Sequence, residues 1–367
     1  RLSPSARLIT SKKGAGMART FYGVSEDRLM PVGDGDSVDL GGKTLRFIDA
    51  PMLPWPETMF TYVPEDAVLF PCDFMGFHTA FGTYDDDIEE FEPFAKRYFG
   101  EIMMPFASMG KKALEKLEKL DIHVIAPSHG PVHRDPSRIV KLYKLWTTGT
   151  TREKVVIVYT SMWGSTERMV MAMADALLGE CVEVCVHNLA SADIGDVARD
   201  LVDSRAIVLG APTVLAGLHP VALYGALLVK ALKPPAKYIA VLSSHGWAGG
   251  AVKQASDLVE GTGMRVVGAA DVKGPPGPVD TGDGHKKAAR RRCAPRPYST
   301  KIVKINPEAL PCSRPLRKRR RCDGCRGDQS WLFVPVAGLS RQAYQRRLRR
   351  LRRRARLVAP ARRHLTR

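Results

Sequence analysis

The chain has 367 residues, of which 44% are hydrophobic and 26% charged, so it is long enough for two domains with cores of their own. Its net charge of +18 is concentrated at one end, because residues 281–367 hold 27 Lys and Arg against 4 Asp and Glu. Seven cysteines without regular spacing disfavour a disulfide-stapled secreted fold, and no apolar run reaches the roughly 18 residues of a membrane span. We therefore expect a cytoplasmic protein without a membrane segment.

Residues 1–150 predict an α+β domain in which short strands give way to helices. The expected strands lie at residues 7–11, 45–49, 59–63, 67–70 and 122–126. Two amphipathic helices are expected at about 88–98 and 108–120, because apolar side chains recur there at helical spacing. The layout looks incomplete at its start, and the first residue is Arg, so we expect a fragment or a processed product.

Residues 151–278 alternate strictly between strands and helices with short loops. The strands are expected at 155–159, 182–186, 206–210, 237–243 and 264–269, and the helices at 166–178, 193–202, 220–232 and 250–260. Such alternation predicts a doubly wound α/β domain, in which a parallel sheet has helices on both faces. Ligands of this architecture bind beyond the carboxyl ends of the strands.

The loop after the first of these strands runs from Thr160 to Thr166 and is rich in hydroxyl groups. It lacks the lysine of a nucleoside-triphosphate P-loop and the spaced glycines of a dinucleotide fold. Hydroxyl and backbone N–H groups at a helix N-terminus suit the single phosphate of a flavin mononucleotide. The alternative is a polar turn whose helix is capped by Ser165 or Thr166.

Two more loops are expected at the same edge of the sheet, at residues 212–217 and 244–249. Their glycines and small residues permit the backbone to approach a planar ring closely. Trp163 and Trp247 could flank such a ring, although either could equally be ordinary packing. Together the three loops favour a flavin site.

The motifs Tyr159-Thr-Ser-Met-Trp-Gly-Ser-Thr166, Ala211-Pro-Thr213 and His245-Gly-Trp247 closely resemble the flavodoxin-like domain of the flavodiiron proteins, also called A-type flavoproteins. The first domain agrees with this resemblance. Its segments Leu45 to Glu57, Leu69-Phe-Pro-Cys-Asp73 and Ala126-Pro-Ser-His-Gly-Pro131 resemble the C-terminal half of that family's metallo-β-lactamase-like domain. The resemblance covers residues 5 to about 278.

The resemblance implies a reductase in which FMN passes electrons to a non-haem di-iron site that reduces dioxygen to water or nitric oxide to nitrous oxide. It implies a rubredoxin-like or other small electron donor and a head-to-tail homodimer. The FMN-binding residues implied are Thr160, Ser161, Met162, Trp163, Gly164, Ser165, Thr166, Pro212, Thr213, Val214, Gly217, Ser244, His245, Gly246, Trp247 and Gly249. By match of motif, Asp73 is a bridging metal ligand, His129 a terminal ligand, and His78 a catalytic histidine near the metals.

The chain departs from the family pattern at several positions. It begins after the point where a His-x-Glu-x-Asp-His motif should stand, and Pro54 occupies the place of another histidine ligand. Two ligands cannot hold a di-iron centre, so an alternative function is a flavodoxin-like electron carrier with a defective metal domain. In the flavin domain, Leu215-Ala216 stand where asparagines are common, and His245 stands where an aromatic residue is frequent.

Residues 279–367 form an arginine-rich tail without amphipathic patterning. We expect it to be disordered or aberrant, for instance read in a shifted frame. Nucleic-acid binding is the second hypothesis, disfavoured because the tail has few aromatic residues for stacking on bases. Cys322 and Cys325 have the spacing of half a metal knuckle, which is the third hypothesis.

Overall fold

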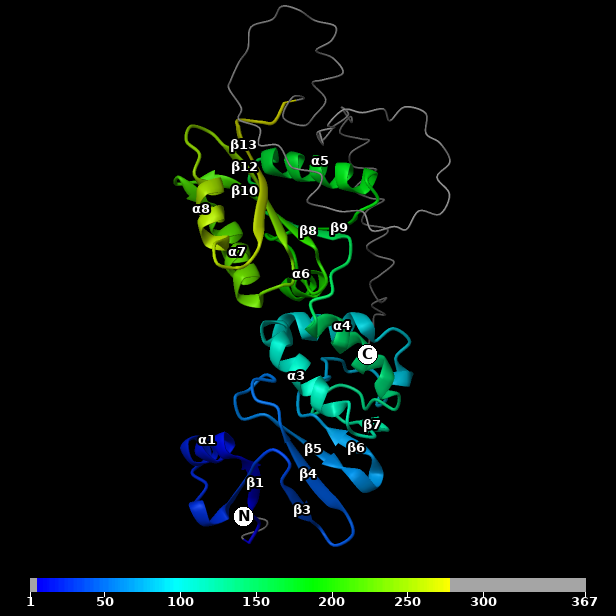
Figure 1. The fold of residues 1–367 in the computed structure, drawn as a ribbon. Helices are drawn as coiled ribbons and strands as arrows, with labels where there is room; N and C mark the ends of the chain where they lie inside the picture. The colour runs from blue at the N-terminus through cyan, green and yellow to red at the C-terminus, as the bar shows by residue number, and fades with distance from the viewer. Residues whose placement is uncertain (1–4, 278–367) are drawn as a thin grey trace, which may run out of the picture.

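The computed structural model describes residues 5–277, which form two units joined end to end (Figure 1). The first unit is built on a five-stranded sheet of order β3-β4-β5-β6-β7, in which only the β6–β7 pair is parallel. Its strands are β3 (Ser37–Asp39), β4 (Thr44–Asp49), β5 (Met59–Val63), β6 (Val68–Phe70) and β7 (Val124–Ile125). Its larger helices are α2 (Glu92–Tyr98), α3 (Ala107–Leu117) and α4 (Pro136–Thr147).

A small two-stranded parallel sheet precedes this five-stranded sheet. It pairs β1 (Leu8–Ser11) with β2 (Leu29–Val32), and α1 (Lys12–Tyr22) connects the two strands. Ser11 caps α1 by accepting a hydrogen bond from the N–H of Gly14 at 3.1 Å. The sequence pattern did not predict α1, because its two glycines weaken the helical signal.

The second unit is a parallel sheet of order β13-β12-β10-β8-β9, as the alternating pattern predicts. Its strands are β8 (Lys154–Tyr159), β9 (Glu183–Asn188), β10 (Ala206–Val214), β12 (Tyr238–His245) and β13 (Arg265–Lys273), with the short β11 (Gly217–Leu218) turning back on β10. Its helices are α5 (Ser165–Gly179), α6 (Ile194–Leu201), α7 (Pro220–Leu232) and α8 (Ala251–Val259). The predicted doubly wound α/β fold is confirmed.

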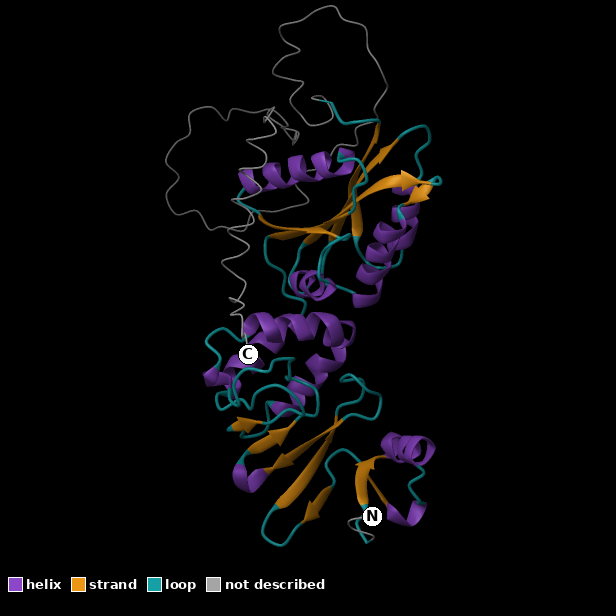
Figure 2. Ribbon diagram, turned by 180° about the vertical axis from the view of Figure 1, so that it is seen from behind, coloured by secondary structure: helices purple, strands orange, loops and turns teal. Residues whose placement is uncertain are grey.

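Helices cover the two faces of this sheet unequally, as both views of the ribbon show (Figures 1 and 2). Alternate residues of a strand point to opposite faces. Val155 and Ile157 of β8 therefore pack with α5, whereas Val156 and Val158 belong to the cluster that contains α6, α7 and α8. All six residues of β8 are buried, which explains why the strand is apolar from Val155 to Tyr159.

The two units share a packed interface in which α2 and the π-helical turn that follows it contact α6. One buried apolar cluster crosses this boundary and includes Phe99 on one side and Val197 on the other. A Cβ atom at Gly100 would lie 2.5 Å from the carbonyl oxygen of Ala198, so only glycine permits this approach of the two backbones.

A buried ion cluster lies at the same interface. Asp203 of the second unit contacts Lys96 of α2 at 2.5 Å and also pairs with Lys154 at the start of β8. The three side chains are 8%, 10% and 2% exposed, respectively, so the charges are shielded from solvent. Burial acts to raise the pKa of Asp203, but the two lysines outweigh it and hold that pKa below its usual value.

Other predicted boundaries differ from the observed ones in the first unit. The helix expected at 88–98 begins only at Glu92, and the strand expected at 122–126 is limited to Val124–Ile125. None of the helices formed by residues 5–277 combines the length and the apolar character needed to cross a bilayer. The arginine-rich tail, with Cys322 and Cys325, lies outside the described residues.

Candidate flavin site and histidine cluster

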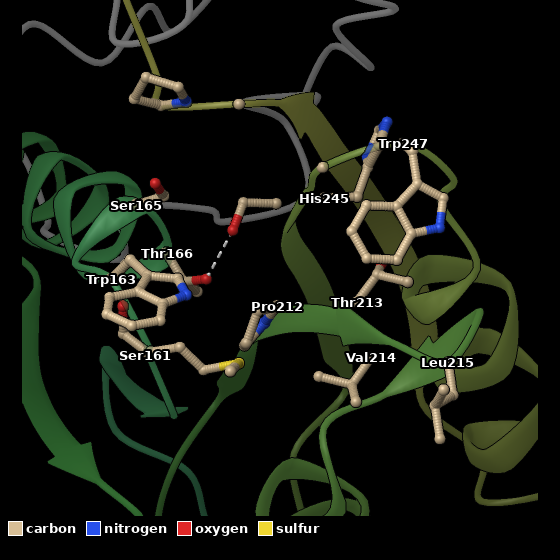
Figure 3. Close-up of a pocket in the computed structure, with 15 residues that line it drawn as sticks. Ser161, Trp163, Ser165, Thr166, Pro212, Thr213, Val214, Leu215, His245 and Trp247 are labelled. Carbon is tan, nitrogen blue, oxygen red and sulfur yellow. Dashed lines mark hydrogen bonds between the residues drawn. The ribbon is translucent and has the colours of Figure 1, made fainter.

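A pocket of about 410 Å³ opens at the carboxyl ends of β8, β10 and β12 (Figure 3). The chain runs from β8 outward to β9 and then crosses back to β10, so the sheet has its topological switch point between β8 and β10. Doubly wound sheets bind their ligands at this position. The lining residues are Ser161, Met162, Trp163, Ser165, Thr166, Pro212, Thr213, Val214, Leu215, Ser244, His245, Gly246, Trp247, Gly274 and Pro275.

The first loop of the pocket is organised by the Ser161 hydroxyl. Its oxygen accepts hydrogen bonds from the backbone N–H groups of Gly164 at 3.1 Å and of Glu167 at 3.3 Å. Gly164 has a φ of 84°, a left-handed conformation that glycine adopts without strain. The alternative in which Ser165 or Thr166 caps α5 is therefore wrong, since Ser161 does so from within the loop.

Hydrogen bonds between hydroxyl groups tie the three loops together. Thr166 Oγ1 lies 3.0 Å from Ser244 Oγ, and both residues are buried. Thr213 Oγ1 lies 3.3 Å from Ser243 Oγ and also accepts, at 3.4 Å, from the N–H of Ala251 at the start of α8. The pocket walls are thus fixed by side chains of the protein itself, before any ligand binds.

Trp163 and Trp247 stand on opposite sides of the pocket (Figure 3). They are 89% and 90% exposed, so neither is part of a hydrophobic core. This exposure contradicts the alternative that they are ordinary packing residues. Two indole rings held in water at a pocket mouth are suited to flanking a planar, partly apolar ligand.

Most residues expected from the sequence line this pocket, but four do not. Thr160 is buried beneath the loop, Gly164 sets its turn, and Gly217 and Gly249 lie behind the second and third loops. Conversely, Leu215, Gly274 and Pro275 line the pocket and were not expected. The last two follow β13, whose carboxyl end lies at the same edge as the other strands, so sheet topology could have indicated them.

The second loop is a tight hairpin between β10 and β11. Val214 pairs with Gly217, which leaves Leu215 and Ala216 as a two-residue turn with φ values of 50° and 58°. Two left-handed residues define a type I′ turn, which favours Asn and Gly. The asparagines common in the resembling family suit such a conformation, whereas Leu and Ala are strained in it.

In the first unit, the structure brings together the three residues expected at a metal site. His129 Nε2 lies 3.6 Å from Asp73 Oδ1, and the rings of His78 and His129 are 5.0 Å apart. Tyr98 packs its ring against both histidines, at 4.9 and 5.0 Å, and was not expected from the sequence. Burial, with the nearby Asp73 charge, raises the pKa of Tyr98 and keeps its phenol neutral.

The loops that carry these side chains touch closely. A Cβ atom at Gly76 would lie 2.7 Å from the carbonyl oxygen of His129, so glycine is required for this contact. Ser128 donates a hydrogen bond to Asp73 at 2.5 Å, and within the described chain the buried His129 Nδ1 has no hydrogen-bond partner. Across residues 5–277, however, no group of three or more His, Cys, Asp or Glu side chains could hold a metal ion. These residues therefore do not fit a di-iron centre.

Comparisons with known proteins agree with both units. Residues 1–130 match the model of the ODP family beta lactamase, and residues 157–291 match that of flavodoxin. A nitric oxide reductase from Moorella thermoacetica is 37% identical over 260 residues, which are 69% of this chain and 65% of that protein. The chain therefore spans a little less than two thirds of the length of this curated relative.

Solved structures give the same picture. The rubredoxin oxygen:oxidoreductase of Desulfovibrio gigas superposes with a TM-score of 0.72 at 26% identity, covering 75% of this chain and 71% of that one. The flavodiiron protein of Giardia intestinalis superposes with a TM-score of 0.68 at 27% identity, covering 73% and 68%. From its two matched domains, their order and these relatives, the chain belongs to the flavodiiron protein family.

Proposed function

We propose that the pocket at the switch point binds FMN and that the chain is an oxidoreductase of the flavodiiron type. The observation that carries this proposal is the pocket itself, whose walls are three hydrogen-bonded loops and two exposed tryptophans. Among residues 5–277, its lining includes no lysine, arginine, aspartate or glutamate. A ligand bound there must be recognised by hydroxyls, backbone N–H groups and stacking, and FMN offers a matching phosphate and ring.

The phosphate end of FMN would be held by Ser161, Ser165 and the first N–H groups of α5. The oxygen of Ser161 already accepts from the backbone, so its O–H proton is available to donate. Thr166 also lines the pocket, but it is 1% exposed and bonded to Ser244, so its side chain is held in place by the wall itself. The positive end of the α5 dipole adds a favourable field for a dianion.

The ring end of FMN would lie between Trp163 and Trp247, beside His245 and the backbone of the second loop. The bound flavin supplies the capacity to take up and release electrons. The protein orients the ring, limits its contact with water and sets the relative affinity of its oxidised and reduced forms.

The activity that we propose for this chain is based on its relatives, which include a nitric oxide reductase and a rubredoxin oxygen:oxidoreductase. We propose a cytoplasmic enzyme that receives electrons from a rubredoxin-like or other small donor and reduces dioxygen or nitric oxide. A head-to-tail homodimer, with residues 1–150 as the metallo-β-lactamase-like domain and 151–278 as the flavin domain, completes the proposal.

A second candidate function is a flavin-based electron carrier with no catalysis of its own. The observation that favours it is that Asp73, His78 and His129 do not complete a metal-binding group among residues 5–277. Neither alternative changes the proposed role of the flavin pocket.

Purification of the full chain separates the two candidates. FMN bound at one per chain, with iron and consumption of dioxygen or nitric oxide under a reductant, supports the reductase. FMN without iron or turnover supports the carrier, and protein that takes up no added FMN overturns both.

A pair of serine variants tests the pocket directly. We expect Ser161→Ala to weaken FMN binding about tenfold or more, because the hydroxyl both organises the loop and contacts a charged group. Ser256→Ala is the matched control, since within residues 5–277 that hydroxyl donates to the carbonyl of Val252 in its own helix α8 and does not line the pocket. Flavin fluorescence during titration measures both affinities.

A further inference from the structure

The pocket residue His245 has an acidic partner that lies behind it. Its Nδ1 atom is 2.9 Å from Oδ1 of Asp271, which belongs to the neighbouring strand β13. In the parallel register Ser243 is opposite Asp271, so the imidazole reaches diagonally back along the same face of the sheet. The two side chains are 16% and 30% exposed.

The chemistry of the pair fixes the tautomer of the imidazole. An ionised carboxylate only accepts hydrogen bonds, so Nδ1 must carry the proton that it donates to Asp271. His245 lines the pocket, on the same side as Trp247, whereas Asp271 is absent from the lining (Figure 3). The carboxylate therefore contacts a ligand only indirectly, through the ring in front of it, and no hydrogen bond within residues 5–277 occupies the Nε2 of that ring.

Gly249 makes room for this pair. A Cβ atom at Gly249 would collide with Oδ2 of Asp271 and would lie 3.6 Å from Nδ1 of His245. The loop after β12 can thus fold over the pair only because this residue has no side chain. This observation gives a reason for the glycine even though it does not line the pocket.

We propose that Asp271 is a positioning residue that, through His245, makes the pocket favour reduced over oxidised FMN. An ionised carboxylate that accepts from Nδ1 holds the imidazole in the tautomer whose Nε2 is a hydrogen-bond acceptor, as in other His–carboxylate pairs. Reduction of a bound flavin would place a proton on a ring nitrogen and so turn a hydrogen-bond acceptor of the ring into a donor. An acceptor on the pocket wall, held in place by Asp271, therefore stabilises the reduced form more than the oxidised form.

This inference rests on the proposed FMN site, and its test uses a ratio that a general loss of structure leaves unchanged. The full-length chain is titrated with oxidised FMN, and anaerobically with FMN kept reduced by excess dithionite. The ratio compared is the Kd for oxidised FMN divided by the Kd for reduced FMN. We expect Asp271→Asn to lower this ratio about tenfold, which corresponds to a change of about 30 mV in the two-electron potential of the bound flavin. Asp257→Asn, which removes an equal charge that is paired with Lys253 on α8, should leave the ratio unchanged.

A second variant shows whether Asp271 acts through the histidine. His245→Gln alone should lower the same ratio, and adding Asp271→Asn to it should cause no further change. The inference is overturned if Asp271→Asn binds both forms of FMN with the wild-type ratio, or if its effect persists without His245. If the wild-type chain binds no FMN at all, the proposed function fails and this inference fails with it.

Discussion

Replacement of Asp203 by Asn tests whether the buried charges between the two units stabilise the protein as the structure indicates. The carboxylate is 8% exposed and compensates the ammonium groups of Lys96 and Lys154, which are 10% and 2% exposed. Arg152 also approaches Asp203, at 3.9 Å, but its side chain is 62% exposed and contributes little. The variant removes the carboxylate that pairs with both buried cations.

Removal of one partner from a buried ion pair costs about 3–5 kcal/mol, because the remaining charge is neither solvated nor compensated. We therefore expect Asp203→Asn to lower the free energy of unfolding by about 4 kcal/mol in urea titrations followed by circular dichroism. Asp257→Asn, which breaks an exposed pair with Lys253, should cost less than about 0.5 kcal/mol.

The same variant reports on the coupling of the two units. Lys96 belongs to the first unit and Asp203 to the second. Loss of the ion pair between them should therefore also separate a single unfolding transition into two. A change below about 1 kcal/mol with one unchanged transition would refute the reasoning, since it would mean that water reaches the lysines.

Three further predictions concern a turn, a buried histidine and a pocket wall. Leu215→Asn combined with Ala216→Gly should raise the free energy of unfolding by about 1 kcal/mol in urea titrations, because both positions have left-handed backbone; equal or lower stability would contradict the turn assignment. Burial lowers the pKa of His133 in the folded protein below the value of about 6.5 that a histidine has in the unfolded chain. As the pH falls, His133 is therefore protonated first in the unfolded chain. The free energy of unfolding, measured in urea titrations, should therefore decrease from pH 7 to pH 5, and it should decrease less in His133→Gln. An equal decrease in the two proteins would argue against this. Trp163→Ala should weaken FMN binding about threefold to tenfold in fluorescence titrations, the value of one aromatic contact, and an affinity within twofold of wild type would exclude the proposed stacking.

The fold of the second unit was predictable because its signals are local and strong. Strand β8 is buried on both faces and is apolar from Val155 to Tyr159, and the helix expected at 220–232 coincides with α7. In the first unit the signals are weaker. Two glycines weaken the helical pattern of α1. Strand β7, which pairs with β6 at the edge of the sheet, has only two residues and so gives little pattern to detect.

The candidate site was predictable where one stretch of sequence carries it, as in the loop from Thr160 to Thr166. Contacts between distant residues were not. Asp271 reaches His245 across a strand pair, 26 residues away, and Tyr98 reaches His129 from a separate helix. Such contacts depend on sheet register and helix packing, which no local pattern specifies.

The hydroxyl pair of Thr166 and Ser244 joins residues that are 78 positions apart, and the pocket lining continues to Pro275. A growing chain therefore cannot present this pocket until its last parallel strand has emerged and paired. Contacts this distant form late in folding. A ligand that recognises only the finished pocket cannot guide the early steps, and its binding energy instead slows the unfolding of a chain that has already folded.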